Sequence, residues 1–374
     1  MKNRIAVLVG TRPEAIKLVP VYLALQQSEN FEPVLISTGQ HREMLAGIFE
    51  LFSVRPDIEL NVMRENQTLV DLTSKLFHEL GAILTLDRFR CVIVQGDTTT
   101  ALAGAVTAHY SRIPVAHVEA GLRTYNNQQP FPEEANRRMI SVVTDFHFAP
   151  TGGAVNALAL EGITGNVFCV GNTVIDSLLT ISDLVDRRSI FYENRFADFV
   201  KKGERLVLVT GHRRESFGQG FKEICLAITR IASAHPDIKI VYPVHLNPNV
   251  REIVFESLSG LENVRLIDPV PYDEMIYLMK CAWMILTDSG GIQEEAPSLN
   301  VPLIIMREVT ERPEVISAGC GLLAGVDSDS IFSMFERIAN SPDLYRDMST
   351  ARNPFGDGKS AQQIANKLNE LIIL

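Results

Sequence analysis

The sequence lacks several patterns that would assign it to a familiar class of protein. None of its five cysteines forms a C-x-x-C pair, and nowhere do eighteen consecutive apolar residues occur. Cysteines scattered in this way are typical of buried thiols in a reducing compartment, and no membrane insertion is expected. The apolar run within residues 4–10 is too short for the core of a signal peptide. The sequence therefore predicts a cytoplasmic enzyme.

Positive charge is also in short supply. The chain has 35 Lys and Arg against 45 Asp and Glu, which gives a formal net charge of -10. A general nucleic-acid or anionic-membrane surface would need clustered basic residues, so no nucleic-acid partner is expected. Any phosphate group must be bound by a local site.

Two nucleotide-binding signatures are missing as well. No G-x-G-x-x-G motif follows a predicted strand, and no G-x-x-x-x-G-K-[ST] motif occurs. These absences argue against a dinucleotide-dependent enzyme and against a phosphate-loop NTPase. His117 and Glu119 could be metal ligands on one strand, but no third ligand is well placed, and a structural pair is the better interpretation. We expect neither a metal nor a cofactor.

Short apolar runs alternate with amphipathic segments over both halves of the chain. At 374 residues the chain exceeds the size of one ordinary core. Near-continuous apolar strands between helices predict parallel sheets covered on both faces, in two doubly wound α/β domains. The predicted strands are residues 4–10, 33–38, 91–97, 114–121 and 167–172, then 205–212, 238–245, 263–270, 283–290 and 301–307.

Domain limits follow from the restart of this pattern. We expect an N-terminal domain over residues 1–170 and a C-terminal domain over 171–357, with a polar linker near 183–202 that contains helix. Residues 358–374 show apolar positions at helical spacing and predict an amphipathic terminal helix. Periodicity alone does not say which domain this helix covers.

Reactive side chains follow the predicted strands, where open parallel sheets bind their ligands. In the first half these are Arg12, Lys17, Gln40, His41, Arg42, Asp97, Glu119, Glu133, Glu134 and Arg137; in the second half they are His212, Arg213, Arg214, His245, Ser289, Gly290, Gly291, Glu294 and Glu295. Carboxylates on one side and phosphate-binding groups on the other suit a substrate with a sugar and a diphosphate.

The segment Thr287–Leu299, "TDSGGIQEEAPSL", is the strongest single signal. Two glycines before a helix allow close approach of a ligand to the backbone, and the first N–H groups of the helix attract phosphate. Plainer explanations exist for each feature. The glycines could form only a tight connection, Asp97 could be a helix N-cap, and Glu133 could favour a helix dipole.

Taken together, ten motifs resemble those of the non-hydrolysing UDP-N-acetylglucosamine 2-epimerases. The resemblance runs from about Arg4 to Gly358, with motifs in order in both halves. The motifs are "GTRPEAIKL", "QHREML", "GDTTT", "HVEAGLRT", "PEEANRR", "GNTVIDSL", "TGHRRESFG", "YPVHLNPNVRE", "LTDSGGIQEEAPSL" and "TERPE".

The resemblance implies a fold of the glycosyltransferase-B type, in which two Rossmann-like domains face a central cleft. It also implies a homodimer and a C-terminal helix that returns to the N-terminal domain. Glu43 and Asn66 depart from the pattern of family members that carry a second, allosteric substrate site. Activation by UDP-GlcNAc is therefore not implied.

Site roles follow from the same resemblance. Ser289, Gly290 and Gly291 approach the diphosphate of UDP, and Glu295 accepts hydrogen bonds from the ribose. Arg12 and His212 contact the diphosphate, while Lys17 and Arg137 lie near the sugar. The implied catalytic residues are Asp97, Glu119, Glu133 and His212, and Gln40, His41, Arg213 and Arg312 complete the implied substrate-binding set.

The implied reaction interconverts UDP-GlcNAc and UDP-ManNAc for a cell-surface polysaccharide. UDP is eliminated across C1 and C2 to give 2-acetamidoglucal and is then added back with inversion at C2. Three alternatives remain open on this scaffold: a hydrolysing epimerase that releases ManNAc and UDP, a glycosyltransferase, and a catalytically silent sugar-nucleotide sensor.

Overall fold

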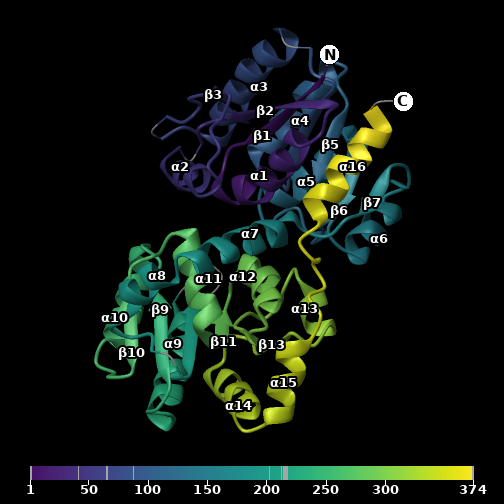
Figure 1. The fold of residues 1–374 in the computed structure, drawn as a ribbon. Helices are drawn as coiled ribbons and strands as arrows, with labels where there is room; N and C mark the ends of the chain where they lie inside the picture. Colours follow the sequence, from purple (N-terminus) through teal and green to yellow (C-terminus); the bar gives the residue numbers. More distant parts are fainter. Residues whose placement is uncertain are drawn as a thin grey trace. The chain divides into compact units, whose positions relative to one another are not determined.

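The computed structural model describes residues 2–40, 42–64, 66–86, 88–201, 203–211, 213 and 218–372, with only the backbone given for Arg42 and Glu43. The chain divides into two compact units (Figure 1). Unit 1 comprises Met1–Leu179 and Phe355–Leu374, and unit 2 comprises Thr180–Pro354.

Unit 1 is built on a parallel sheet with the strand order β3-β2-β1-β4-β5-β6-β7 among its described residues. The order in which successive strands are added changes direction between β1 and β4. This position is the topological switch point of the doubly wound sheet. Its strands are β1 (Asn3–Val9), β2 (Phe31–Ser37), β3 (Ile58–Glu59), β4 (Cys91–Gln95), β5 (Val115–Val118), β6 (Phe146–Ala149) and β7 (Val167–Cys169).

Helices cover both faces of this sheet (Figure 1). The wholly buried strands β4 and β5, and β1 with its last five residues buried, explain the continuous apolar runs in the sequence. The helices are α1 (Arg12–Gln26), α2 (Arg42–Leu51), α3 (Leu69–Leu86), α4 (Thr99–Tyr110), α5 (Glu133–Val143), α6 (Gly152–Leu160), α7 (Thr173–Arg187), which contains the boundary with unit 2, and α16 (Ser360–Ile372).

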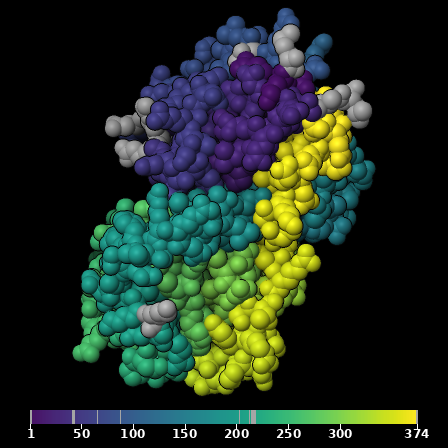
Figure 2. Space-filling model, viewed as in Figure 1, coloured from purple at the N-terminus to yellow at the C-terminus, as the bar shows by residue number. Residues whose placement is uncertain are grey.

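The terminal helix α16 packs against α1 of unit 1, and Figure 2 shows it in yellow beside the purple N-terminal segment. Its buried apolar positions are Ala361, Ile364, Ala365 and Leu368. They occupy the helical face that the periodicity predicted. The backbone N–H of Ala361 also donates to the carboxylate of Asp176 in α7, at 2.9 Å.

Unit 2 repeats the arrangement with the strand order β10-β9-β8-β11-β12-β13 among its described residues. Its switch point lies between β8 and β11. The strands are β8 (Leu206–Thr210), β9 (Lys239–Pro243), β10 (Val264–Ile267), β11 (Ala282–Thr287), β12 (Leu303–Ile305) and β13 (Gly321–Leu323). The helices are α8 (Ser189–Phe196), α9 (Gln219–Ala234), α10 (Pro248–Leu258), α11 (Tyr272–Cys281), α12 (Gly290–Glu295), α13 (Pro313–Ser317), α14 (Ser328–Ala339) and α15 (Pro342–Thr350), with a 3₁₀ turn at Ala296–Leu299 after α12.

Each of the ten predicted strands exists, usually with shorter bounds than the apolar run. The strands that the pattern missed are β3, β6 and β13. Each of them has only two to four residues, and β6 carries His147 within the sequence "FHFA". Short strands of this kind leave no apolar run to detect. No helix among the described residues is long and apolar enough to cross a membrane.

Gly10, directly after β1, permits the closest approach at the switch point of unit 1. A Cβ atom on Gly10 would lie 2.7 Å from Thr38 Oγ1 and would overlap Thr100 as well. We predict that Gly10→Ala lowers the free energy of unfolding by about 1–3 kcal/mol, because the neighbouring side chains must shift. Urea denaturation measures this change.

Gly47→Ala is the matched control. Gly47 lies within α2, and an added Cβ would meet no described atom within 4 Å. Since alanine favours helix over glycine, this variant should gain about 0.5–1 kcal/mol. Equal effects of the two substitutions would contradict the steric argument.

Candidate active site

The switch point of unit 1 gathers predicted site residues from two loops. Arg12 begins α1 just after β1, and Asp97 follows β4, the strand that pairs with β1. Because parallel strands end at the same edge of a sheet, these loops lie at the position where doubly wound folds bind ligands. Motifs that are far apart in the sequence thus lie at one edge of the sheet.

Glu119 directly follows β5 and is buried, with 8% of its surface exposed. Its Oε1 atom lies 2.5 Å from Lys17 Nζ and accepts from Asn172 Nδ2 at 3.2 Å. Gln95 Nε2 donates to its Oε2 atom. The backbone of Glu119 has φ = 65°, in the left-handed region that non-glycine residues seldom adopt. Such a strained position fixes the direction of the side chain and is frequent at functional sites.

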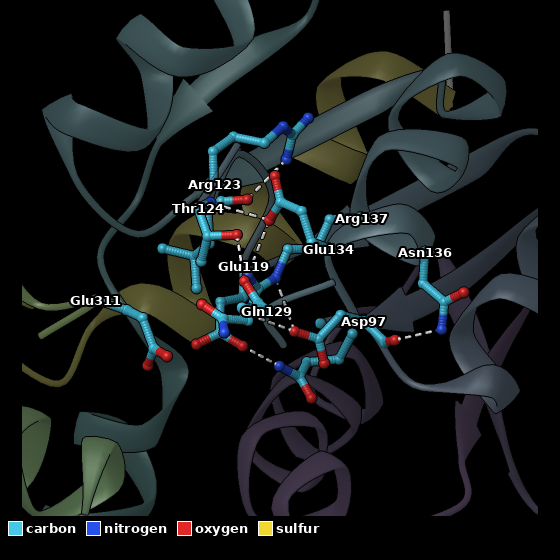
Figure 3. A network of polar contacts seen from close by, with 12 residues as sticks. Asp97, Glu119, Arg123, Thr124, Gln129, Glu134, Asn136, Arg137 and Glu311 are labelled. Atoms are coloured by element: carbon cyan, nitrogen blue, oxygen red, sulfur yellow. Dashed lines mark hydrogen bonds and ion pairs between the residues drawn. The ribbon is translucent and has the colours of Figure 1, made fainter. Parts of the chain in front are cut away.

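Asp97 is held by α5 (Figure 3). Its Oδ2 atom lies 2.8 Å from Arg137 Nε and 2.7 Å from the NH2 nitrogen of the same residue. The side chain of Asn136 donates to the Asp97 carbonyl oxygen at 2.8 Å. The Asp97 backbone and carboxylate are therefore both anchored. Asp97 does not cap α4, because Thr98 occupies that position and accepts from the N–H of Ala101.

Arg137 is itself fixed from the opposite side by Glu134 (Figure 3). The distance from Arg137 NH1 to Glu134 Oε2 is 3.1 Å, and the Glu134 side chain is fully buried. The backbone N–H groups of Thr124 and Tyr125 also donate to Glu134, at 2.9 and 3.0 Å. One carboxylate thus links the segment after β5 to the guanidinium that holds Asp97.

The remaining predicted residues of unit 1 have separate surroundings. Gln40 accepts a hydrogen bond from the Thr100 hydroxyl at 3.2 Å. Glu133 is the first residue of α5, and its Oε2 atom is buried without a hydrogen-bond partner among the described residues. His41 lies outside the described residues, as does the side chain of Glu43.

His117 supports the loop that carries Asp97. Its Nε2 atom lies 2.7 Å from the carbonyl oxygen of Gly96, whose φ of 67° requires glycine-like freedom. Burial lowers the pKa of His117 to about 3. A neutral imidazole therefore donates this bond at ordinary pH. His117 contacts Gly96, whereas Glu119 contacts Lys17, Gln95 and Asn172. No metal-binding cluster occurs among the described residues.

Two arginines of unit 2 lie close to the start of α12. The side-chain ends of Arg213 and Arg312 lie 3.6 and 3.8 Å from the point that a Cβ atom of Gly290 would occupy. Gly290 follows Ser289, the N-cap of the helix. The buried Asp288 fixes the loop after β8 by accepting from the backbone N–H of Arg213 at 2.8 Å. The two arginines and the helix start together favour an anion.

Carboxylates hold these arginines in place. Glu294 Oε1 lies 2.5 Å from Arg312 Nε, and Glu311 lies 3.8 Å from both Arg213 and Arg312. Burial raises the pKa of Glu311, but the charges of Arg307, Arg213 and Arg312 outweigh it and hold that pKa below its usual value. Glu311 is therefore an ionised counter-charge within the cluster.

Glu295 closes α12 and is almost fully buried. Its Oε1 atom accepts from the Tyr272 hydroxyl at 2.6 Å, and Tyr272 begins α11. Gly291 is exposed beside Gly290. His212 and Arg214, which the sequence placed among the candidates, lie outside the described residues.

Sequence reasoning missed several residues that organise the two clusters. One of them carried a readable signal, because Thr11-x-x-Glu14 is the pattern of a helix capping box. The others depend on contacts between distant segments, which no local pattern encodes. The missed residues are Glu14, Gln95, Asn136, Asn172, Tyr272, Asp288 and Glu311.

Comparisons with known proteins agree with this architecture. The family model described as UDP-N-acetylglucosamine 2-epimerase matches residues 23–369. A relative from Escherichia coli (strain K12) named UDP-N-acetylglucosamine 2-epimerase is 47% identical over 368 residues, which covers 98% of each chain. The fold defines a doubly wound protein of two units, with two arginines at the start of α12 in the second unit. The chain belongs to the UDP-N-acetylglucosamine 2-epimerase family.

Solved structures give the same result. A Neisseria meningitidis UDP-GlcNAc 2-epimerase bound to UDP-GlcNAc is 42% identical, with a TM-score of 0.93 over 98% of this chain and 100% of the other. An S. aureus protein solved with UDP is 37% identical, with a TM-score of 0.90 over 100% of this chain and 98% of the other. The predicted glycosyltransferase-B type of fold, with two Rossmann-like units, is confirmed.

The buried His117 generates a prediction about acid stability. Its folded pKa of about 3 lies below the usual 6.5. Between pH 6.5 and about 3, the imidazole binds a proton in the unfolded chain but not in the folded protein. The stability present above pH 6.5 is therefore lost as the pH falls toward 3. His117→Gln should reduce the slope of unfolding free energy against pH by about 1.4 kcal/mol per pH unit within this window.

Urea unfolding at several pH values between 4.5 and 7.5 measures this slope. His78→Gln replaces an exposed histidine on α3 and controls for the loss of an imidazole as such. An unchanged slope in His117→Gln would show that its imidazole does not contribute to acid denaturation.

Proposed function

We propose that this protein is a non-hydrolysing 2-epimerase that interconverts UDP-GlcNAc and UDP-ManNAc. The observation that carries the proposal is the placement of Asp97 and Glu119 after the adjacent strands β4 and β5, each held against a cationic side chain. Membership of the epimerase family and the relative bound to UDP-GlcNAc support this substrate.

Unit 2 would bind the UDP moiety. Arg213, Arg312 and the start of α12 supply positive charge and free N–H groups for a diphosphate, and Ser289, Gly290 and Gly291 leave room for it. Glu295 would accept hydrogen bonds from the ribose hydroxyls, with Tyr272 orienting its carboxylate. The carboxylate and the phosphate site do not conflict, because Glu295 lies at the opposite end of α12 from Gly290.

The chemistry requires a base, an acid and stabilisation of the leaving group. The C2 hydrogen of UDP-GlcNAc is not next to a carbonyl group, so its direct removal is difficult. Elimination of UDP across C1 and C2 gives 2-acetamidoglucal, and return of a proton to the other face, with addition of UDP, completes the inversion. No net oxidation occurs, which agrees with a reaction that needs no nicotinamide.

Asp97, Glu119 and Glu133 are proposed as the acid and base set for this proton transfer. Arg12 and His212 would stabilise the departing UDP. Lys17 and Arg137 would keep the carboxylates of Glu119 and Asp97 in fixed positions, which their ion pairs support. Gln40 and His41 would complete the substrate-binding set.

Three wider proposals accompany this function. The enzyme would act as a homodimer, would work in the cytoplasm, and would supply ManNAc units for a cell-surface polysaccharide. The five free cysteines are consistent with a reducing compartment.

Two other activities fit the same scaffold. A hydrolysing epimerase would let water attack the intermediate and would release free ManNAc and UDP. A glycosyltransferase would bind the same nucleotide sugar but would transfer the sugar to an acceptor. The acids at the edge of the unit 1 sheet favour the epimerases, since both of their reactions begin with proton transfer at C2.

Incubation with UDP-GlcNAc in D₂O, without added metal or cofactor, tests the function directly. Proton NMR should show UDP-ManNAc with deuterium at C2, because the base exchanges its proton with solvent. Free ManNAc with UDP would instead assign the hydrolysing reaction. An unchanged substrate would refute both epimerase reactions and would favour a glycosyltransferase.

Substitution of the proposed acids tests their roles. Asp97→Asn and Glu133→Gln should each lower kcat by about 10²–10⁴-fold, because neither amide can transfer the proton. UDP affinity, measured by calorimetry, should stay within about twofold of wild type. Glu161→Gln removes a carboxylate that pairs with Arg123 at 2.7 Å and serves as the control. Near-normal turnover would remove that acid from the mechanism.

A further inference from the structure

Glu14 is a buried carboxylate to which the proposed reaction assigns no part. It is the third residue of α1, and only 1% of its surface is exposed. Its Oε2 atom accepts from the backbone N–H groups of Gly10 and Thr11, at 3.1 and 2.7 Å. Its Oε1 atom accepts from the Thr98 hydroxyl at 2.6 Å. Both oxygens are thus in use.

These donors belong to two different loops. Gly10 and Thr11 form the connection between β1 and α1, which leads into Arg12, whereas Thr98 lies between β4 and α4 and directly follows Asp97. The two loops meet at the switch point of the sheet. Glu14 therefore joins the segment that carries Arg12 to the segment that carries Asp97.

Thr98 transmits this link to the backbone. Its Oγ1 atom donates to Glu14 and accepts from the N–H of Ala101 at 3.0 Å, so the hydroxyl is fixed from both sides. The residues around it are also held: His117 contacts the carbonyl of Gly96, and Asn136 donates to the carbonyl of Asp97. Three consecutive residues, 96 to 98, are each anchored by a side chain from another segment.

Capping of α1 does not account for this arrangement alone. A cap at the helix surface satisfies the same backbone groups while remaining solvated. Here burial raises the pKa of Glu14 to about 7, although the hydrogen bonds from Thr98, Thr11 and Gly10 lower it. Desolvation of the Glu14 carboxylate is thus unfavourable for folding. The hydrogen bond between Glu14 and Thr98 is the contact that a simple cap would lack.

We propose that Glu14 is a positioning residue that fixes Asp97 for proton transfer through Thr98. The inference rests on the proposed epimerase function, because Asp97 has its role there. Glu14 does not contact the reacting atoms. Its effect should appear in the rate of the chemical step and not in the binding of UDP.

Three variants test the link through Thr98. Glu14→Gln and Thr98→Val should each reduce kcat at least tenfold, with the affinity for UDP within about twofold of wild type. Thr98→Ser keeps the hydroxyl and should retain turnover within about threefold. Combining Glu14→Gln with Thr98→Val should cost little more than either change alone, because both disturb the same contact between residues 14 and 98.

Asp176→Asn is the matched control for loss of a buried carboxylate. Asp176 lies in unit 1, accepts from the backbone N–H of Ala361, and has a pKa raised by burial. Its substitution should lower thermal stability and leave kcat within about twofold. A similar fall in kcat for Asp176→Asn and Glu14→Gln would show that Glu14 acts only through the general stability of unit 1, and it would overturn the proposal.

Hydrogen exchange separates this proposal from the proposed function. Amides in residues 96–101 should exchange at least tenfold faster in Glu14→Gln and Thr98→Val than in wild type or Asp176→Asn. If wild type fails to epimerise but exchange rises as expected, the reaction is wrong and the structural link stands. Unchanged exchange with normal turnover in Glu14→Gln would refute the link itself.

Discussion

Carboxylates buried at the edge of a parallel sheet must find donors, and this requirement organises unit 1. Glu14, Glu119 and Glu134 are all largely inaccessible to water, and an unpaired charge there would be strongly destabilising. Backbone N–H groups, a lysine and an arginine meet the requirement. Because these donors come from separate loops, satisfying the acids also fixes the loops. The same contacts consequently stabilise the sheet edge and set the geometry of the proposed chemistry.

Unit 2 instead holds several positive charges close to one another. Arg213 and Arg312 would repel one another near Gly290, and Glu294 and Glu311 provide the counter-charge, with Glu311 also paired with Arg307. The guanidinium groups are thereby placed in advance, which lowers the cost of ordering them on binding. These ion pairs lie at the proposed UDP site, at the start of α12.

The two units use one topological rule for different chemistry. In both, the loops after the two strands at the switch point carry the polar groups, and buried strands bring them there. Unit 1 places acids and Arg12 at this edge, and unit 2 places arginines and glycines. On nearly the same framework, differences in the loop residues distinguish the proposed proton transfer from the proposed phosphate recognition.

The sequence by itself determined most strands of both sheets, the parallel class and the loops that carry Asp97, Glu119 and Ser289, because buried strands and turn glycines are local patterns. It did not separate Glu133 from Glu134, although one is partly exposed and the other is the buried partner of Arg137. Only the tertiary structure decided which groups meet: Lys17 with Glu119 across 102 residues, and Glu14 with Thr98 across 84. Hydrogen bonds depend on distance in space, and the spacing of residues along the chain does not encode it.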